Sequence, residues 1–291
     1  MAAQPSHSQE MAGTTVLVTG ATQGIGKETA LGLLRLGARV GIAGRDPART
    51  EAVARELREQ VPGGVVDTFV ADLSLARETR KLAAEVKRRY ERLHVLLNNA
   101  GAIFGDRQVT AEGLERTFAL NHLSYFILTG ELLGLLRASG PSRIVNVASE
   151  AHRRGRVDFD DLQSRNYSSF RVYSTSKLEN ILYTRELSRR LAESGSQVTA
   201  NCLHPGVIAS GFGRNNSGLF GLLARLAAPF LSTPLKGART SIHVASSPAA
   251  ARVSGKYFKD SRETAPSRAA QDDAAARRLW VETEKVASSL P

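Results

Sequence analysis

Short apolar runs alternate along this chain with longer stretches in which apolar residues recur every three or four positions. The short runs predict strands at residues 14–19, 39–43, 65–70, 95–97, 143–148, 197–203 and 255–258. The longer stretches predict helices at residues 25–36, 47–60, 75–90, 111–137, 173–193, 235–245 and 269–287. Strands joined by helices of about ten or more residues are typical of βαβ units. The pattern therefore predicts an α/β fold with a doubly wound, parallel, seven-stranded sheet and helices on both faces.

The chain shows no internal repeat and no Pro/Ser-rich linker, which predicts one domain over residues 13–291 behind a disordered tail at residues 1–12. Two segments interrupt the alternation. Residues 150–172 are polar and rich in Arg, whereas residues 211–234 are rich in Gly and then apolar. Both follow strands at the end where open α/β sheets bind ligands. We expect both to build the substrate site, with residues 211–234 as a lid and Phe220 against the substrate.

Composition narrows the class of protein. Of the 291 residues, 42% are hydrophobic and 23% are charged, as in soluble globular proteins. Because no apolar run reaches about 18 residues, no membrane span is expected. An apolar helix within residues 211–234 would also suit permanent packing on the domain or shallow membrane contact. The single cysteine, Cys202, excludes an intrachain disulfide and indicates a reducing, cytoplasmic location.

The charge balance is strongly basic, with a net charge of +11 from 39 Lys and Arg against 28 Asp and Glu. Such an excess suits anionic partners, including a phosphorylated cofactor. The Arg residues are scattered rather than grouped in blocks, which favours solvated helix faces over a nucleic-acid site. The His residues have no ligand spacing, so no metal is expected.

A glycine-rich segment, TGATQGIG at residues 19–26, joins the first predicted strand to the first predicted helix. Glycines there allow a tight turn and bring a diphosphate close to backbone N–H groups at the positive end of a helix. A plain turn is the alternative, but the strand before and the helix after favour a dinucleotide site. The residues expected to hold the cofactor in this loop are Gly20, Thr22, Gln23, Gly24, Ile25 and Gly26.

The spacing of this loop, TGxxxGxG, resembles that of the short-chain dehydrogenase/reductase family, and further motifs of the family follow in order over residues 14–260. The resemblance implies a single-domain Rossmann fold and a nicotinamide cofactor. The cofactor contacts that it implies beyond the loop are Asp72, Leu73, Asn99, Ala100 and Gly101 (within NNAG), Pro205, Gly206, Ile208 and Ser210.

The pair Tyr173 and Lys177 forms a YxxxK motif, whose members share one face of a helix. A free Tyr has a pKa of about 10, and a neighbouring ammonium or an oxidised nicotinamide lowers it. Tyr173 could then serve as general acid or general base. The family resemblance further implies that Lys177 holds the nicotinamide ribose, that Ser149 binds the substrate oxygen, and that Asn121 positions a water linked to Lys177.

The end of the second predicted strand reads Gly44-Arg45-Asp46. An acidic residue at this place would accept from the ribose hydroxyl of NAD, whereas Arg pairs with the 2′-phosphate of NADP. Gly44 offers no carboxylate, and Arg45 supplies a guanidinium suited to a phosphate. Arg45 could instead be a plain surface residue, with Asp46 capping the helix that begins at residue 47. The sequence favours NADP(H), with NAD less suited.

The interval between Ser149 and Tyr173 holds Glu150-Ala151-His152 and FDDL at residues 159–162, which resembles the retinol-dehydrogenase-like branch of the family. His152 either borders the substrate or is a buried structural residue. We expect an NADP(H)-dependent oxidoreductase that acts on a hydrophobic alcohol or carbonyl compound. The alternative is a non-catalytic NADP-binding regulator or scaffold on the same fold. The resemblance also suggests a homodimer that pairs the helices around Asn121 and Tyr173.

Overall fold

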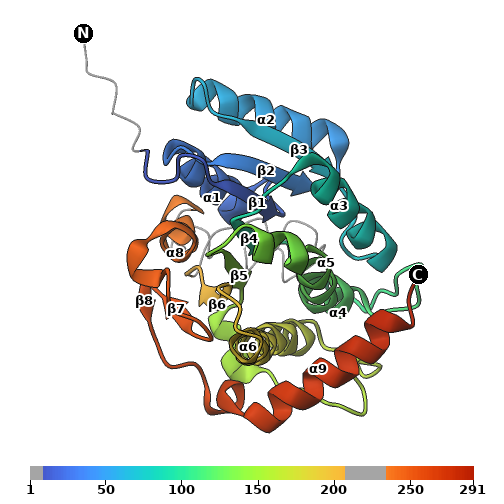
Figure 1. Ribbon diagram of the computed structural model, residues 1–291. Coiled ribbons are helices and arrows are strands. Elements are labelled where there is room, and N and C mark those ends of the chain that lie inside the picture. The colour runs from blue at the N-terminus through green and yellow to red at the C-terminus, as the bar shows by residue number, and fades with distance from the viewer. Residues whose placement is uncertain (1–8, 207–233) are drawn as a thin grey trace.

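A computed structural model describes residues 9–206 and 234–291 of the chain, and its centre is one twisted sheet (Figure 1). The strand order is β3-β2-β1-β4-β5-β6-β7-β8, and every neighbouring pair is parallel except β7 and β8. The strands are β1 (Thr15–Thr19), β2 (Arg39–Gly44), β3 (Val66–Val70), β4 (Val95–Asn98), β5 (Arg143–Val147), β6 (Thr199–His204), β7 (Tyr257–Lys259) and β8 (Arg262–Glu263).

Helices cover both faces of the sheet, which confirms the predicted α/β layers. One face packs against α1 (Gly24–Arg35), α2 (Pro47–Gln60) and α8 (Pro234–Ser246). The other face packs against α3 (Ala76–Arg89), α5 (Ser124–Ala138) and α6 (Ser169–Glu193). A further helix, α9 (Asp273–Ser288), lies outside α6 (Figure 1). The central strands are buried on both sides, which explains why their sequences are apolar runs rather than alternating ones.

The sheet has one strand more than the seven predicted. The chain turns back after β7 through Asp260 and Ser261, whose φ angles of 50° and 60° are left-handed, and β8 then pairs antiparallel with β7. A two-residue loop with two positive φ angles is the hairpin turn that matches the twist of a sheet. Two residues are too few for any hydrophobic period, so the pattern of the sequence carries no signal for β8.

The opposite edge of the sheet is β3, and arginine side chains from its flanking helices reach its backbone. Arg58 Nη2 donates a hydrogen bond to the carbonyl oxygen of Val66 at 2.7 Å, and Arg89 Nη1 donates to that of Thr68 at 2.9 Å. Two edge carbonyls therefore have side-chain partners, and two of the many Arg residues have structural roles.

The long helix expected over residues 111–137 is shorter and interrupted. Residues 111–115 form a turn, the short helix α4 (Arg116–Phe118) follows, and a π-helical turn at Ala119–Leu123 leads into α5. The helix begins only after Glu115, whose carboxylate caps it by accepting hydrogen bonds from the backbone N–H groups of Thr117 and Phe118.

The stretch Arg116–Ala138 is the one candidate membrane span within the described residues, by length and composition alone. Its apolar window is 61% buried inside the protein, as in a core helix of a soluble protein.

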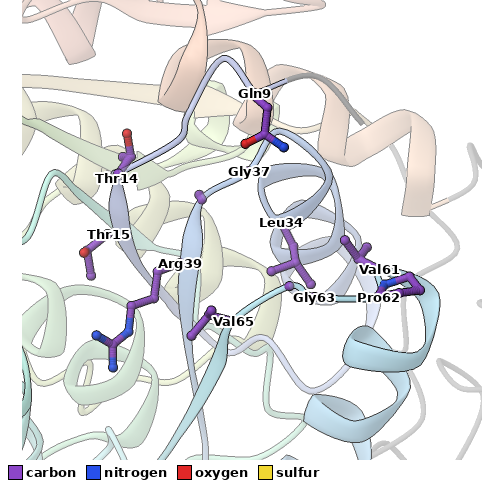
Figure 2. Close-up of a pocket in the computed structure, with 13 residues that line it drawn as sticks. Gln9, Thr14, Thr15, Leu34, Gly37, Arg39, Val61, Pro62, Gly63 and Val65 are labelled. Carbon is purple, nitrogen blue, oxygen red and sulfur yellow. The ribbon is translucent and has the colours of Figure 1, made fainter. Parts of the chain in front are cut away.

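The N-terminal tail expected at residues 1–12 is folded where the structure describes it. Met11 is buried, and its backbone N–H donates to Leu36 at 2.8 Å. Beside it, a cavity of about 420 Å³ lies at the strand starts, lined by residues that include Thr14, Arg39 and Val65 (Figure 2). The predicted functional residues follow the strand ends, so this cavity lies at the other end of the sheet.

Candidate active site

The predicted site residues gather at the carboxyl ends of the parallel strands. From β1 the chain proceeds to β2 and β3 on one side, and β4 then pairs with β1 on its other side. The crevice between β1 and β4 is the point at which open α/β sheets bind nucleotides. The glycine loop leaves β1 here, and residues 99–101 leave β4 beside it, so the fold brings the two predicted cofactor segments together.

The glycine loop can only be built with glycines at the positions where the backbone approaches itself. Gly20 and Gly24 have φ angles of +65° and +55°, a conformation that L side chains rarely adopt. A Cβ at Gly26 would lie 2.4 Å from the carbonyl oxygen of Gly20. Helix α1 begins at Gly24 without a side-chain cap from Gln23 and without an acidic residue in its first turn. Its first N–H groups therefore suit an anion such as a diphosphate.

Asn99 fixes this loop to the end of β4. Its Nδ2 donates to the carbonyl oxygens of Thr19 at 2.9 Å and Gly20 at 3.2 Å. The hydroxyl of Thr19 in turn accepts from the backbone N–H groups of Asn99 and Ala100. The Asn99 side chain thus positions the loop, and Thr19, which the sequence analysis did not select, is its partner.

The end of β2 leaves no room for a side chain at residue 44. A Cβ on Gly44 would lie 2.4 Å from both Thr22 Cγ2 and Thr50 Oγ1. Arg45 is exposed and makes no hydrogen bond or ion pair with any described residue. Asp46 accepts from the backbone N–H of Arg49 at 2.8 Å and so caps α2. Asp46 therefore caps α2 while the guanidinium of Arg45 has no partner among the described residues, so the two interpretations of this segment hold together.

Asp72 and Leu73 follow β3 at the same edge of the sheet. One carboxylate oxygen of Asp72 accepts from the backbone N–H and the hydroxyl of Ser74, at 3.0 and 2.7 Å. Leu73 is buried. The Asp72 side chain therefore holds the turn after β3 in place.

The structure brings Ser149, Tyr173 and Lys177 together, from the end of β5 and the first three turns of α6. Tyr173 and Ser149 share a hydrogen bond. Lys177 Nζ lies 5.7 Å from the centre of the Tyr173 ring and donates to the carbonyl oxygen of Val147 at 3.1 Å. The Oγ of Ser149 accepts from the backbone N–H of Ala151 at 3.2 Å, which leaves its own proton to donate elsewhere.

Burial decides the electrostatics of this group. It lowers the pKa of Lys177 to about 7 and raises the pKa of Tyr173 to about 12, and the bond from Ser149 opposes the second shift. The expectation that Lys177 lowers the pKa of Tyr173 is therefore wrong for the protein's own groups. A desolvated ammonium that loses its proton near neutral pH exerts little attraction on a phenolate.

Asn121 lies in the π-helical turn and links three segments. Its Oδ1 accepts from the backbone N–H of Ala102 at 2.9 Å, and its Nδ2 donates to the carbonyl of Ala102 and to the hydroxyl of Ser176. A Cβ on Gly101 would lie 3.2 Å from this Oδ1 and 3.3 Å from Lys177 Nζ. A side chain at residue 101 would therefore crowd Asn121 and Lys177, which would have to shift by a few tenths of an ångström to admit it.

The Arg-rich segment 150–172 has two parts with different contacts. Phe159 and Leu162 pack against the apolar cluster that residues of α6 and α9 form with Ala148 and Tyr257. The hydroxyl of Tyr167 donates to the carbonyl of Phe104 at 2.7 Å, in the loop after β4. His152 has no exposed surface, which identifies it as the buried residue of the two alternatives.

Pro205 and Gly206 follow β6 at the same edge, and Gly206 has a φ angle of +94°. Ile208, Ser210, Phe220 and the expected lid up to residue 233 lie outside the described residues. Residue 234, the last of that segment, already belongs to α8.

Residues 14–217 match the family described as short chain dehydrogenase. Retinol dehydrogenase 14 from Homo sapiens is 45% identical over 290 residues, covering 93% of this chain and 85% of the relative. Retinol dehydrogenase 13 from Homo sapiens is 42% identical, over 94% and 84%.

Two solved structures share the fold. An uncharacterized protein from Mycobacterium paratuberculosis has a TM-score of 0.77 at 32% identity, covering 98% of this chain and 96% of that one. The Pseudomonas aeruginosa RhlG/NADP complex has a TM-score of 0.69 at 30% identity, covering 88% and 97%.

Proposed function

This chain belongs to the short-chain dehydrogenase family, and from that premise we propose that it is an NADP(H)-dependent oxidoreductase of hydrophobic alcohols or carbonyl compounds. The observation that carries the proposal is the group of Ser149, Tyr173 and Lys177 beside the glycine loop. A scaffold that only bound a nucleotide would have no need of a phenol and an alcohol hydrogen-bonded to each other at this place. The nicotinamide, when bound, supplies or accepts the hydride.

Proton transfer falls to Tyr173. In the reducing direction its phenol gives its proton to the substrate oxygen, while the Ser149 hydroxyl donates a hydrogen bond to the same oxygen. The high pKa that burial gives Tyr173 keeps the phenol protonated at neutral pH, which suits reduction. Lys177 is close enough to interact with the resulting phenolate, and a protonated Lys177 would stabilise it.

Arg45 and Gly44 support NADP(H) over NAD(H). The exposed Arg45 guanidinium has no partner among the described residues, and residue 44 has no space for the carboxylate that would bind a ribose hydroxyl. The structural relative from Pseudomonas aeruginosa is an NADP complex. A phosphorylated cofactor also fits the net charge of +11.

The hydrophobic substrate is proposed from the relatives. Those at 40–45% identity are named retinol dehydrogenases, and retinol is an apolar alcohol. Apolar substrate surface is stabilised in a protein pocket by about 25 cal/mol per Å² buried. Activity should therefore rise with chain length across a series of aldehydes or ketones.

The test is consumption of NADPH with an aldehyde and ketone series, measured for the wild type and Tyr173→Phe. Loss of the phenol proton should lower kcat by about 100-fold or more while NADPH binding persists. Tyr90→Phe is the matched control, because it removes a phenol hydroxyl that donates to Asp67 near the start of β3, far from the proposed group, and its kcat should stay close to wild type. NADPH binding without turnover of any substrate would instead favour the regulator or scaffold.

A further inference from the structure

His152 is a buried imidazole three residues after Ser149, in the 3-10 turn Glu150–Arg154, and both of its ring nitrogens contact backbone groups. The backbone N–H of Ser267 lies 3.0 Å from Nε2, and the carbonyl oxygen of Ser149 lies 2.6 Å from Nδ1. An N–H can only donate and a carbonyl can only accept. Nε2 therefore carries no proton, and the neutral ring must carry its single proton on Nδ1.

A second histidine holds the other side of the same peptide unit. His204 Nδ1 accepts from the backbone N–H of Glu150 at 3.2 Å. The carbonyl of Ser149 and the N–H of Glu150 belong to one rigid plane, so two imidazoles fix the orientation of this plane. The Glu150 carboxylate is itself held by the hydroxyl of Tyr257 at 2.8 Å, and the Tyr257 ring packs edge-on against His152 with centroids 5.1 Å apart.

We propose that His152 is a positioning residue for Ser149, in that its Nδ1–H holds the Ser149–Glu150 peptide and thereby aims the Ser149 hydroxyl at Tyr173 and the substrate oxygen. Ser267 contributes to this positioning, because its N–H donates to Nε2 and so keeps the proton of His152 on Nδ1. The proposal rests on the proposed function for its effect on rate, whereas the protonated nitrogen of His152 can be tested without any substrate.

Ser267→Pro removes the Ser267 N–H and places its Cδ where that hydrogen points, against Nε2 of His152, so it deletes the donor and also displaces the imidazole. Ser267 has a φ angle of −64°, the value that proline requires, so Ser267→Pro deletes the donor without backbone strain. Ser267→Ala is the matched control, because it removes the hydroxyl that accepts from Ala270 and keeps the N–H. Ser267→Pro should lower kcat by about tenfold, since small misplacements of a reacting group are costly. Ser267→Ala should leave kcat unchanged.

A second pair of variants separates positioning from packing. The amide nitrogen of His152→Asn can take the place of Nδ1 and still donate to Ser149. The longer side chain of His152→Gln reaches the place of Nε2, where it can accept from Ser267 but not donate to Ser149. His152→Asn should therefore retain kcat within about threefold, and His152→Gln should lose about tenfold, with NADPH affinity unchanged in both. If His152 had a purely structural role, the loss of kcat in each variant would follow only its loss of thermal stability, whichever ring nitrogen the new side chain replaces.

The direct measurement is the ¹⁵N spectrum of the His152 imidazole in the full-length wild type, which distinguishes a proton on Nδ1 from one on Nε2. We expect Nδ1–H in the wild type and in Ser267→Ala, because the carbonyl of Ser149 and the N–H of Ser267 are present in both. Protonation on Nε2 in the wild type would overturn the proposal, as would equal kcat for His152→Asn and His152→Gln. If the wild type turns over no substrate, the proposed function and the effect of His152 on rate both fail, and the spectrum then decides the tautomer alone.

Discussion

At the scale of single residues, Arg45 is the residue on which the proposed preference for NADP(H) can be tested. If it pairs with the 2′-phosphate, Arg45→Ala should raise the KM for NADPH by about 10- to 100-fold, because charged hydrogen bonds contribute about 1.5–3 kcal/mol. Kinetics with NADH should hardly change. Arg55→Ala removes an equal charge from the exposed face of α2 and controls for net charge. Equal losses with both cofactors would contradict the assignment.

Lys177 predicts a conflict between stability and function. In the unfolded chain its pKa is 10.5, and burial lowers the pKa to about 7 in the folded protein. The unfolded state therefore binds the proton more tightly, so the resulting destabilisation is complete below pH 7 and disappears as pH rises to 10.5. Lys177→Met should raise the free energy of unfolding at pH 7 by about 1–2 kcal/mol.

Denaturant unfolding curves of the wild type and Lys177→Met at pH 7 and pH 10, without added cofactor, measure this difference in the free energy of unfolding. The gain from Lys177→Met should shrink between pH 7 and pH 10, and a gain that stays constant would show that burial does not lower the pKa of Lys177. Activity should fall in the same variant at both pH values.

At the scale of elements, the hairpin between β7 and β8 is suboptimal. Asp260 and Ser261 both adopt positive φ angles, at which glycine is favoured over residues with a Cβ. Ser261→Gly should raise the free energy of unfolding by about 0.5–1 kcal/mol, since the backbone N–H that donates to Thr240 is retained. Ser261→Ala keeps the strain and serves as the control in thermal melts. Equal melting temperatures for the two variants would rule out strain at this position.

The elements also show which features the sequence could reveal. The parallel strands and the long helices follow from apolar period, and the glycine loop follows from its spacing between a strand and a helix. The π-helical turn around Asn121 and the two-residue strand β8 have no such period. The contact between His152 and Ser267 joins residues 115 positions apart, which no local pattern reports. The effect of burial on Tyr173 and Lys177 depends on tertiary packing in the same way.

At the scale of the whole molecule, α9 covers the outer face of α5 and α6. Trp280 stacks on Tyr183 with ring centroids 5.7 Å apart and packs edge-on against Phe126 at 4.9 Å. The hydroxyl of Thr283 bonds His122 Nε2 at 3.0 Å. The homodimer suggested by the family resemblance would need this same face, and α9 of the same chain already occupies it (Figure 1).

We therefore expect a monomer of 31.3 kDa rather than a dimer through α5 and α6. Light scattering on a size-exclusion column at micromolar concentration measures this directly. Trp280→Ala should loosen α9 and promote association through the uncovered apolar face. A wild-type dimer that dissociates on mutation of α5 or α6 would contradict this prediction.

The two edge strands of the sheet, β3 and β8, affect how readily the protein aggregates at high concentration. A free strand edge is a template for another chain, and proteins that lack protection there aggregate. Here Arg58 and Arg89 bind two carbonyls of β3, and β8 ends the other side after two residues. Within the described residues, neither margin presents a long, bare ladder to a neighbour. The guanidinium groups of Arg58 and Arg89 should therefore hinder another chain from pairing with β3.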